Sequence, residues 1–456
     1  MLKGYVCLIG AGPGDAGLIT RRGFDYLVRA DVILYDHLIP YALLLYASPH
    51  CELIAVGKEG GKPSTGQDEI NALMIMKARE GKFVVRLKGG DSFLLGRGGE
   101  EAQALADAGI PFIIVPGISS SYAVPAYAGI PVTDRRINSG VNVSTGHKTG
   151  LQNGKNTQVI LMALANLANV VAELVKQGYE RTTPSCLVSR GTTPFQQVVA
   201  GDLGSIVSLA QKTRLPSPAL LIVGDVVEFH KKLAWQQNLP FYRKRILWTR
   251  PLDKAEPDIL RELELCGAEV VRFPLTEIRP TPKESYQDIL EEIPRSTWLV
   301  FTSGTAVELF YKAILHWGKD WRFLNNCRIA VIGGQTGKTL REKGRIPDLT
   351  AAETTSQGLL TSLKDRLQKD DQVLLCRARQ TLPVLVEGLQ QAGIRYKDYH
   401  LYEIVLPEYR AYLVKTILAD PFDLIVFTSP LAVANFFSII DSSEGSLDEK
   451  TKFACI

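Results

Sequence analysis

The stretch YVCLIGAGPGDAGLIT, residues 5–20, joins a short apolar run to a glycine-rich turn and the start of a helix. An apolar strand followed by such a turn and a helix is typical of a parallel β-α-β unit. Gly12, Gly14 and Gly17 also satisfy the G-x-G-x-x-G spacing of dinucleotide-binding turns, and Asp36 ends the next apolar run. The stretch therefore predicts an α/β fold, but it leaves the class of ligand open.

Two residues of this turn disfavour a dinucleotide. Pro13 has no backbone N–H to offer to a pyrophosphate, and Asp15 would bring a negative charge close to the phosphates. When the fingerprint is started at Gly10, where the strand ends, its third glycine falls on Asp15. We therefore favour a ligand without phosphates, and we keep an NAD-dependent oxidoreductase as the alternative from another class.

The wider pattern predicts three α/β units. In the first 135 residues, helical stretches alternate with strand-like runs at 5–9, 32–35, 52–56, 83–87 and 111–115. Closer-spaced apolar runs after about residue 140, with a helix at 166–178, predict a second subdomain with a mixed sheet. We interpret 228–244 as a linker to the third unit, in which FTSGTAVELF (301–310) and FTSPLAVANF (427–436) indicate a repeat of two similar α/β halves.

Composition excludes several classes of protein. The chain has 456 residues, 46% hydrophobic and 22% charged, and a net charge of +4 that is too mild to indicate nucleic-acid binding. No apolar run reaches the ~18 residues of a membrane span, and the N-terminus lacks the features of a signal peptide. Seven scattered cysteines without C-x-x-C predict neither a disulfide framework nor a metal site. We expect a cytoplasmic enzyme.

Further glycine-rich stretches specify the first half. RLKGGDSFLLGRGGEE (86–101), VPGISSSYAVPAYAGIPVTDR (115–135) and VSTGHK (143–148) follow GAGPGD and YDHL in order. The set, spanning residues 3 to about 240, resembles uroporphyrinogen-III C-methyltransferases, S-adenosylmethionine enzymes of the tetrapyrrole methylase class. The resemblance implies a methylase domain over 1–240, with subdomains of about 1–135 and 136–240 and a ligand cleft between them. A sister methylase acting on a later corrin precursor is the nearer alternative.

The resemblance also implies roles for individual residues. Asp36 would accept a proton and Lys58 would donate one, while Arg97, Arg135 and Lys148 would bind an acceptor with eight carboxylates. Methylation of uroporphyrinogen III at C2 and C7 would give precorrin-2, the branch point to sirohaem and cobalamin, and family members resemble homodimers. The S-adenosylmethionine ligands would be Pro13, Gly89, Gly90, Asp91, Leu94, Ser119, Ser120, Met162 and Gly191.

Four positions depart from the family pattern: His37, Ser92, Leu95 and Asp134. Ser92 and Leu95 stand where proline and phenylalanine are common, which alters the stiffness and packing of that loop. Asp134 replaces a common histidine, and we expect it to add a negative charge near an anionic substrate.

The second half, 245–456, resembles uroporphyrinogen-III synthase, which closes hydroxymethylbilane into a ring with one pyrrole inverted. The similar segments are ILWTRP (246–251), LVFTSGTAV (299–307), IAVIGGQTGKTLREKG (329–344), ETTSQGLL (353–360), HLYEIV (400–405) and DLIVFTSPLAV (423–433). They imply two Rossmann-like lobes that work without a cofactor. The residues implied are Tyr402 in catalysis and Arg250, Ser303, Thr336 and Ser429 in substrate binding.

The chain stops at KFACI, an apolar strand-like run, where a complete synthase would continue into a further turn and helices. We therefore expect the synthase unit to be incomplete at its C-terminus, which leaves its activity in this form open. Because no glycine-rich NAD module precedes Met1, we do not expect oxidation of precorrin-2 or iron insertion.

Overall fold

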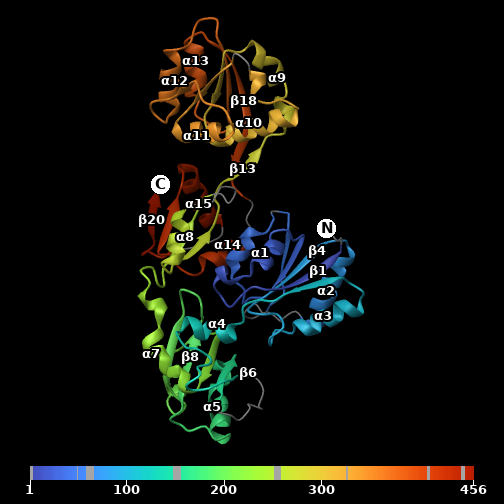
Figure 1. Ribbon diagram of the computed structural model, residues 1–456, viewed down its shortest axis with the longest axis vertical. Coiled ribbons are helices and arrows are strands. Elements are labelled where there is room, and N and C mark those ends of the chain that lie inside the picture. Colours follow the sequence, from blue (N-terminus) through green and yellow to red (C-terminus); the bar gives the residue numbers. More distant parts are fainter. Residues whose placement is uncertain are drawn as a thin grey trace. The chain divides into compact units, whose positions relative to one another are not determined.

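The computed structural model describes residues 4–48, 50–57, 66–146, 156–250, 258–324, 327–407, 411–442 and 447–455. It divides into two compact units (Figure 1). The first comprises Met1–Phe273 and Glu408–Ile456, and the second comprises Pro274–Pro407. Within the described ranges, no helix combines the length and the apolar character needed to cross a membrane.

The first unit begins with a five-stranded parallel sheet in the order β3-β2-β4-β1-β5, drawn in blue in Figure 1. Its strands agree with the predicted ones to within a residue at each end: β1 (Tyr5–Gly10), β2 (Val32–Tyr35), β3 (Glu52–Ala55), β4 (Phe83–Lys88) and β5 (Phe112–Val115). The helices between them are α1 (Arg21–Leu27), α2 (Gln67–Arg79), α3 (Gly98–Asp107) and α4 (Ser120–Tyr127). Every residue of β1 and β4 is buried, because helices cover a parallel sheet on both faces.

The second sheet, drawn in green, has the order β6-β7-β10-β8-β9. Only β6 and β7 pair in parallel, so the sheet is mixed as predicted. Its strands are β6 (Val141–Thr145), β7 (Thr157–Leu161), β8 (Pro184–Ser189), β9 (Gln197–Asp202) and β10 (Ala219–Val223). Helices α5 (Leu167–Lys176) and α6 (Ile206–Thr213) pack on one face, and Val124 and Ala128 from the region of α4 pack on the other.

The segment predicted as a linker is folded. Residues 228–244 contribute to η4 (Asp225–Phe229) and contain α7 (His230–Leu233) and η5 (Trp235–Asn238). The indole Nε1 of Trp235 donates to the carbonyl oxygen of Ala126 at 3.0 Å, and His230 Nδ1 pairs with the carbonyl of Ala128. The charged, proline-containing composition suggested a free linker, but tertiary contacts with the end of α4 hold the segment in place.

The remainder of the first unit is a four-stranded parallel sheet in the order β12-β11-β19-β20. It joins β11 (Arg245–Trp248) and β12 (Glu269–Arg272) to β19 (Leu424–Phe427) and β20 (Lys452–Cys455), which come from the far end of the chain. The accompanying helices are α8 (Asp258–Leu265), α14 (Ala411–Leu418) and α15 (Pro430–Ser442).

The second unit is built on a six-stranded sheet in the order β13-β18-β17-β14-β15-β16. The strands are β13 (Glu277–Pro280), β14 (Trp298–Phe301), β15 (Arg328–Val331), β16 (Leu349–Thr350), β17 (Gln372–Ala378) and β18 (Arg395–Val405). Helices α12 (Ser356–Lys364) and α13 (Val384–Gln391) contribute to one apolar core of this unit. Helices α9 (Ile289–Glu292), α10 (Gly304–His316) and α11 (Gly334–Glu342) contribute to the other. Two separate apolar cores result.

The two FTS segments adopt the same local structure in different sheets. One runs from β14 into α10 and the other from β19 into α15. Ser303 Oγ accepts from the backbone N–H of Ala306, and Ser429 Oγ accepts from that of Ala432, both at 3.1 Å. Each serine therefore satisfies an N–H group at the start of its helix, which is a role that the FTS pattern repeats.

Candidate active sites

A cavity of about 480 Å³ lies between the first two sheets of the first unit. Its walls come from the loops at the carboxyl ends of β1, β2, β4 and β5 and from the neighbourhood of β7, β8 and β10. All nine residues predicted to bind S-adenosylmethionine line it, together with Asp36 and Arg97. Parallel sheets bind ligands at this edge, because the loops there converge while the strands below stay rigid.

The glycines of the opening turn pack the protein backbone against itself. A Cβ atom on Gly10 would lie 2.5 Å from Gly117 Cα and 2.6 Å from the carbonyl oxygen of Gly90. Gly12 and Gly90 form an isolated β-bridge in the same place. The close approach that glycine allows is therefore used between loops, and only Pro13 of the GAGPGD segment reaches the cavity wall.

Asp15 points away from the predicted cofactor. It caps the short helix η1 (Ala16–Leu18) by accepting from the N–H of Gly17 at 2.8 Å. Its other oxygen accepts from the hydroxyl of Tyr127 at 2.9 Å. Burial and the Asp15 charge raise the pKa of Tyr127. The negative charge that disfavoured phosphates in the sequence serves as a structural link to α4.

Two wall residues have features that are common at ligand sites. Met162, directly after β7, has φ +55 and is 41% exposed at the cavity wall. A non-glycine residue in this left-handed region is uncommon and concentrates at functional sites. The carboxylate of Asp91 accepts from the N–H groups of Phe93 and Gly117, both at 2.8 Å, and so ties two cavity loops together. Its oxygens keep lone pairs for further donors.

Asp36 stands at the cavity end of a charged cluster. Its side chain is 28% exposed, and Arg86 Nη2 donates to its Oδ1 at 2.6 Å. Lys88 Nζ lies 3.8 Å from Oδ2 and 2.9 Å from Oε1 of the buried Glu101. Burial, followed by the nearby charge of Arg86, lowers the pKa of Lys88. The cluster gives the cavity a polar end, where the Asp36 carboxylate is paired with Arg86 and lies near Lys88.

Of the basic residues predicted to act in the methylase half, only Arg97 is found at the cavity wall among the described residues. Arg97 lines the cavity, but it is paired with Glu100 at 2.8 Å, and both side chains are more than half exposed. Arg135 is exposed and is not part of the cavity wall. Lys58 and Lys148 lie outside the described residues.

Asp134 brings less negative charge than expected. Its two oxygens accept from Arg136 Nε and Nη2, both at 2.9 Å, and this pairing lowers the pKa of Asp134 to about 2. The carboxylate is therefore ionised and neutralised by its neighbour two residues along the chain. The guanidinium of Arg136 also lies over the ring of Phe229.

Sequence reasoning missed part of the wall. Arg86 and Gln67 line the charged end, where both contact the buried Glu101. Pro218, directly before β10, and Leu220, within it, line the wall from the second sheet. Arg86 did carry a signal, because an arginine inside the otherwise apolar strand FVVRLK must find buried partners. Nothing in the sequence around Pro218 marks it as a wall residue, since its proximity depends on how the second sheet folds.

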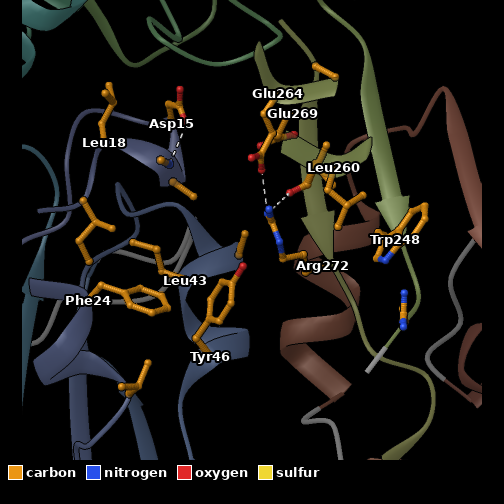
Figure 2. A pocket seen from close by; sticks show the side chains of 18 of the residues that line it. Asp15, Leu18, Phe24, Leu43, Tyr46, Trp248, Leu260, Glu264, Glu269 and Arg272 are labelled. Atoms are coloured by element: carbon orange, nitrogen blue, oxygen red, sulfur yellow. Dashed lines mark hydrogen bonds and ion pairs between the residues drawn. The ribbon is translucent and has the colours of Figure 1, made fainter. Parts of the chain in front are cut away.

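Arg250, predicted as a synthase residue, lines a different cavity of the first unit, of about 860 Å³ (Figure 2). The cavity wall combines apolar side chains such as Phe24, Leu43 and Trp248 with charged ones. Figure 2 shows Arg272 directed at Glu264, with its Nη1 2.8 Å from the carboxylate. Asp15 on the opposite wall is engaged with Gly17 and Tyr127, so much of the charge around this cavity is already paired.

In the second unit, Ser303 and Tyr402 are brought together. The two hydroxyl oxygens are 2.8 Å apart, and Tyr402 is 5% exposed. A register shift between β17 and β18, at Arg377 and Ala378, lets Tyr402 join Tyr399 and Leu401 in the same apolar core. Burial raises the pKa of Tyr402, whereas the hydrogen bond with Ser303 acts in the opposite direction. A β-bulge of this kind re-aims one side chain towards a helix terminus.

Two further synthase candidates with hydroxyl groups, Thr336 and Ser429, lie in different units. Thr336 is buried in the first turn of α11, and Ser429 caps α15 in the first unit. Among the described residues, the synthase candidates with hydroxyl groups therefore lie chiefly at helix starts.

Comparisons with known proteins agree with the family resemblance of each half of the chain. Residues 5–207 match the family described as Tetrapyrrole (Corrin/Porphyrin) Methylases, and residues 258–456 match Uroporphyrinogen-III synthase HemD. A relative from Ruminiclostridium josui, named Porphyrin biosynthesis protein HemD, is 34% identical over 450 residues, covering 96% of this chain and 89% of the relative. The chain belongs to the same family as this relative, which covers both halves. It is a tetrapyrrole methylase fused to a uroporphyrinogen-III synthase.

Other relatives match only about half of this chain. Siroheme synthase 1 of Yersinia pseudotuberculosis is 45% identical over 246 residues, which is 52% of this chain and 52% of that protein. The chain thus spans about half the length of such relatives. A Thermus thermophilus structure described as uroporphyrin-III C-methyl transferase complexed with S-adenyl homocysteine is 35% identical, with a TM-score of 0.42, and covers 49% of this chain and 93% of that one.

Proposed function

We propose that this chain methylates uroporphyrinogen III at C2 and C7 to give precorrin-2, and that its second half forms uroporphyrinogen III from hydroxymethylbilane. Residues 1–240 would form the methyltransferase and 245–456 the synthase. The observation that carries the proposal is the convergence of all nine predicted cofactor residues, with Asp36, on one cavity. Products of this kind feed the sirohaem and cobalamin branches of tetrapyrrole biosynthesis.

The cavity residues fit S-adenosylmethionine, a sulfonium ligand without phosphate. Backbone at Gly89, Gly90 and Gly191 allows close approach, and Asp91 offers carboxylate oxygens for ribose or amino groups. The exposed thioether of Met162 offers a soft apolar surface for the adenine. When bound, this cofactor supplies an electrophilic methyl group and its own leaving group.

The protein's own contribution is positioning and proton transfer. Holding a pyrrole carbon in line with the methyl group is worth ~7–11 kcal/mol of the barrier in well-oriented reactions. Asp36 is the carboxylate at the polar end of the cavity, and it would accept the proton that the methylated pyrrole loses. Lys58 remains the proposed proton donor on the basis of resemblance.

Binding of the octacarboxylate acceptor would use cations at the cavity mouth. Arg97 lines the cavity, and its guanidinium is already arranged around the two oxygens of Glu100. Because that pair is exposed, an incoming carboxylate can replace Glu100 at little cost. We propose Arg135 and Lys148 as further contacts.

In the synthase half, the Tyr402 hydroxyl would assist the loss of water from the linear bilane, with Ser303 holding the hydroxyl in place. Arg250, Thr336 and Ser429 would contact the substrate. We also propose that the enzyme acts in the cytoplasm as a homodimer. All seven cysteines are free thiols, which fits a reducing compartment.

An anaerobic assay of the full chain tests the proposal. Uroporphyrinogen III and S-adenosylmethionine are supplied, and products are followed by mass and absorbance. A gain of two methyl groups supports it, whereas cofactor binding without transfer points to a later corrin precursor. Failure to bind S-adenosylmethionine contradicts the methylase proposal. In a second assay, hydroxymethylbilane replaces uroporphyrinogen III, and formation of the inverted ring tests the synthase.

A further inference from the structure

The strand β4 carries two cations into the interior of the methylase half. Arg86 and Lys88 are two residues apart, so they point to the same face of the sheet. They are 2% and 4% exposed. Buried cations are strongly unfavourable unless carboxylates surround them. The structure supplies one carboxylate on each side, Asp36 towards the cavity and Glu101 towards α3.

Glu101 binds both cations through a single oxygen. Its Oε1 accepts from Arg86 Nε at 3.0 Å and from Lys88 Nζ at 2.9 Å. Gln67 Nε2, from α2, donates to the same oxygen at 3.2 Å. The residue is fully buried, and its Oε2 meets no donor among the described residues. A half-satisfied buried carboxylate is a poor choice for stability alone, which indicates a role beyond packing.

The cations in turn determine where the Asp36 carboxylate lies. Arg86 Nη2 holds Oδ1 at 2.6 Å while its Nε remains on Glu101, so one guanidinium spans both carboxylates. The planar fork of arginine makes this a rigid connection. Pairing of Tyr35 with Leu87 places the residue after β2 directly beside this part of β4.

We propose that Glu101 is a positioning residue of the methyl-transfer site, acting through Arg86 and Lys88 to hold the Asp36 carboxylate against the bound substrate. Glu101 does not line the cavity, so it acts without touching substrate or cofactor. The inference rests on the proposed function, because it assumes that Asp36 takes part in methyl transfer. Burial and Arg86 lower the pKa of Lys88, while Glu101 and Asp36 act in the opposite direction, so the charge on Lys88 is favoured by these two carboxylates.

The first test is Glu101→Gln in the full chain, with methyl transfer to uroporphyrinogen III as the assay. We expect kcat to fall about 10- to 100-fold, because small displacements of a catalytic group have effects of this size. The Kd for S-adenosylhomocysteine and the KM for uroporphyrinogen III should change less than twofold. Glu69→Gln, an exposed substitution on α2, is the control and should leave all three values unchanged. An unchanged kcat in Glu101→Gln would overturn the inference.

A charge-balanced variant keeps the proposal testable if Glu101→Gln folds poorly. Lys88→Gln with Glu101→Gln removes one positive and one negative charge together. If Glu101 acts through the cations, its effect on kcat shrinks in the Lys88→Gln background, and the two effects do not multiply. Multiplicative effects, or a loss of S-adenosylhomocysteine affinity that parallels the loss of kcat, would contradict it.

The two levels of proposal can fail separately. An inactive wild-type chain would count against the proposed methyltransferase itself. A wild-type chain that is active, with full activity retained in Glu101→Gln, would overturn only the positioning role.

Discussion

The methylase and synthase halves use their sequence motifs differently. In the methylase half, residues from GAGPGD, GGDSF, VPGISS and the loops of a second sheet converge on one cavity. In the synthase half, Ser303 and Ser429 sit at the starts of similar helices in two different units, and Thr336 is buried in the first turn of α11. Loops that meet at one edge of a parallel sheet can build a ligand site, whereas a repeated helix cap is first of all a local structural device.

The largest expected effect comes from variants that remove the catalytic group of one half and leave the activity of the other half unchanged. Asp36→Asn should lower methyl transfer about 10²- to 10⁴-fold, the usual contribution of a proton-transfer group, and leave ring closure of hydroxymethylbilane unchanged. Tyr402→Phe should do the reverse, with a smaller loss of ring closure. The two activities are measured in the same preparations, by methyl incorporation and by chromatographic separation of the inverted from the uninverted ring. Loss of both activities in either variant would break the comparison.

A matched pair of cap variants tests whether Ser303 is more than a helix cap. Ser303→Ala and Ser429→Ala should each cost about 1 kcal/mol of unfolding free energy, since each removes one acceptor at a helix start. Only Ser303→Ala also removes the partner of the Tyr402 hydroxyl. We therefore expect Ser303→Ala to lower the kcat of ring closure more than Ser429→Ala does, at a temperature where both variants are folded. Equal kcat values in the two variants would mean that Ser303 acts only as a helix cap.

A smaller effect is expected at the cavity mouth. Glu100→Gln frees Arg97 from its bidentate partner, so the KM for uroporphyrinogen III should fall about two- to fivefold at low salt. The gain should vanish at high ionic strength, because exposed charges are screened. Steady-state kinetics at two salt concentrations provide the measurement. A raised KM would mean that Glu100 orients Arg97 for the substrate.

The smallest effect concerns alkaline stability. The pKa of Tyr127 is raised above its ordinary value of 10.0 by burial and by Asp15. Below pH 10 this tyrosine is neutral in both folded and unfolded chains, and its contribution is complete. Above pH 10 the unfolded chain loses the proton first, so stability falls as the pH rises. Tyr127→Phe should flatten the decrease of Tm above pH 10, and an unchanged slope would assign that decrease to other groups.

Much of the methylase fold and site followed from local sequence signals. The strand β1 is an apolar run that is buried along its whole length, and glycine motifs follow β1 and β4. The charged end of the cavity did not follow, since Glu101 is fifteen residues from Arg86 and meets it only when α3 packs on the sheet. Residues 228–244 were taken for a linker because their contacts with α4 are tertiary.

The amino-acid sequence by itself determined the α/β class, the mixed second sheet and, through motifs that resemble a known family, the nine predicted cofactor residues that line the methylase cavity. These depend on hydrophobic periodicity, on glycine and proline at turns, and on short motifs, which are local properties of the chain. Only the tertiary structure decided that Asp15 bonds to Tyr127, that the glycines of the opening turn pack against other loops, and that Arg86 joins two carboxylates. Such contacts join residues far apart in sequence, and their partners are chosen by how buried charges and crowded backbones can be satisfied in three dimensions.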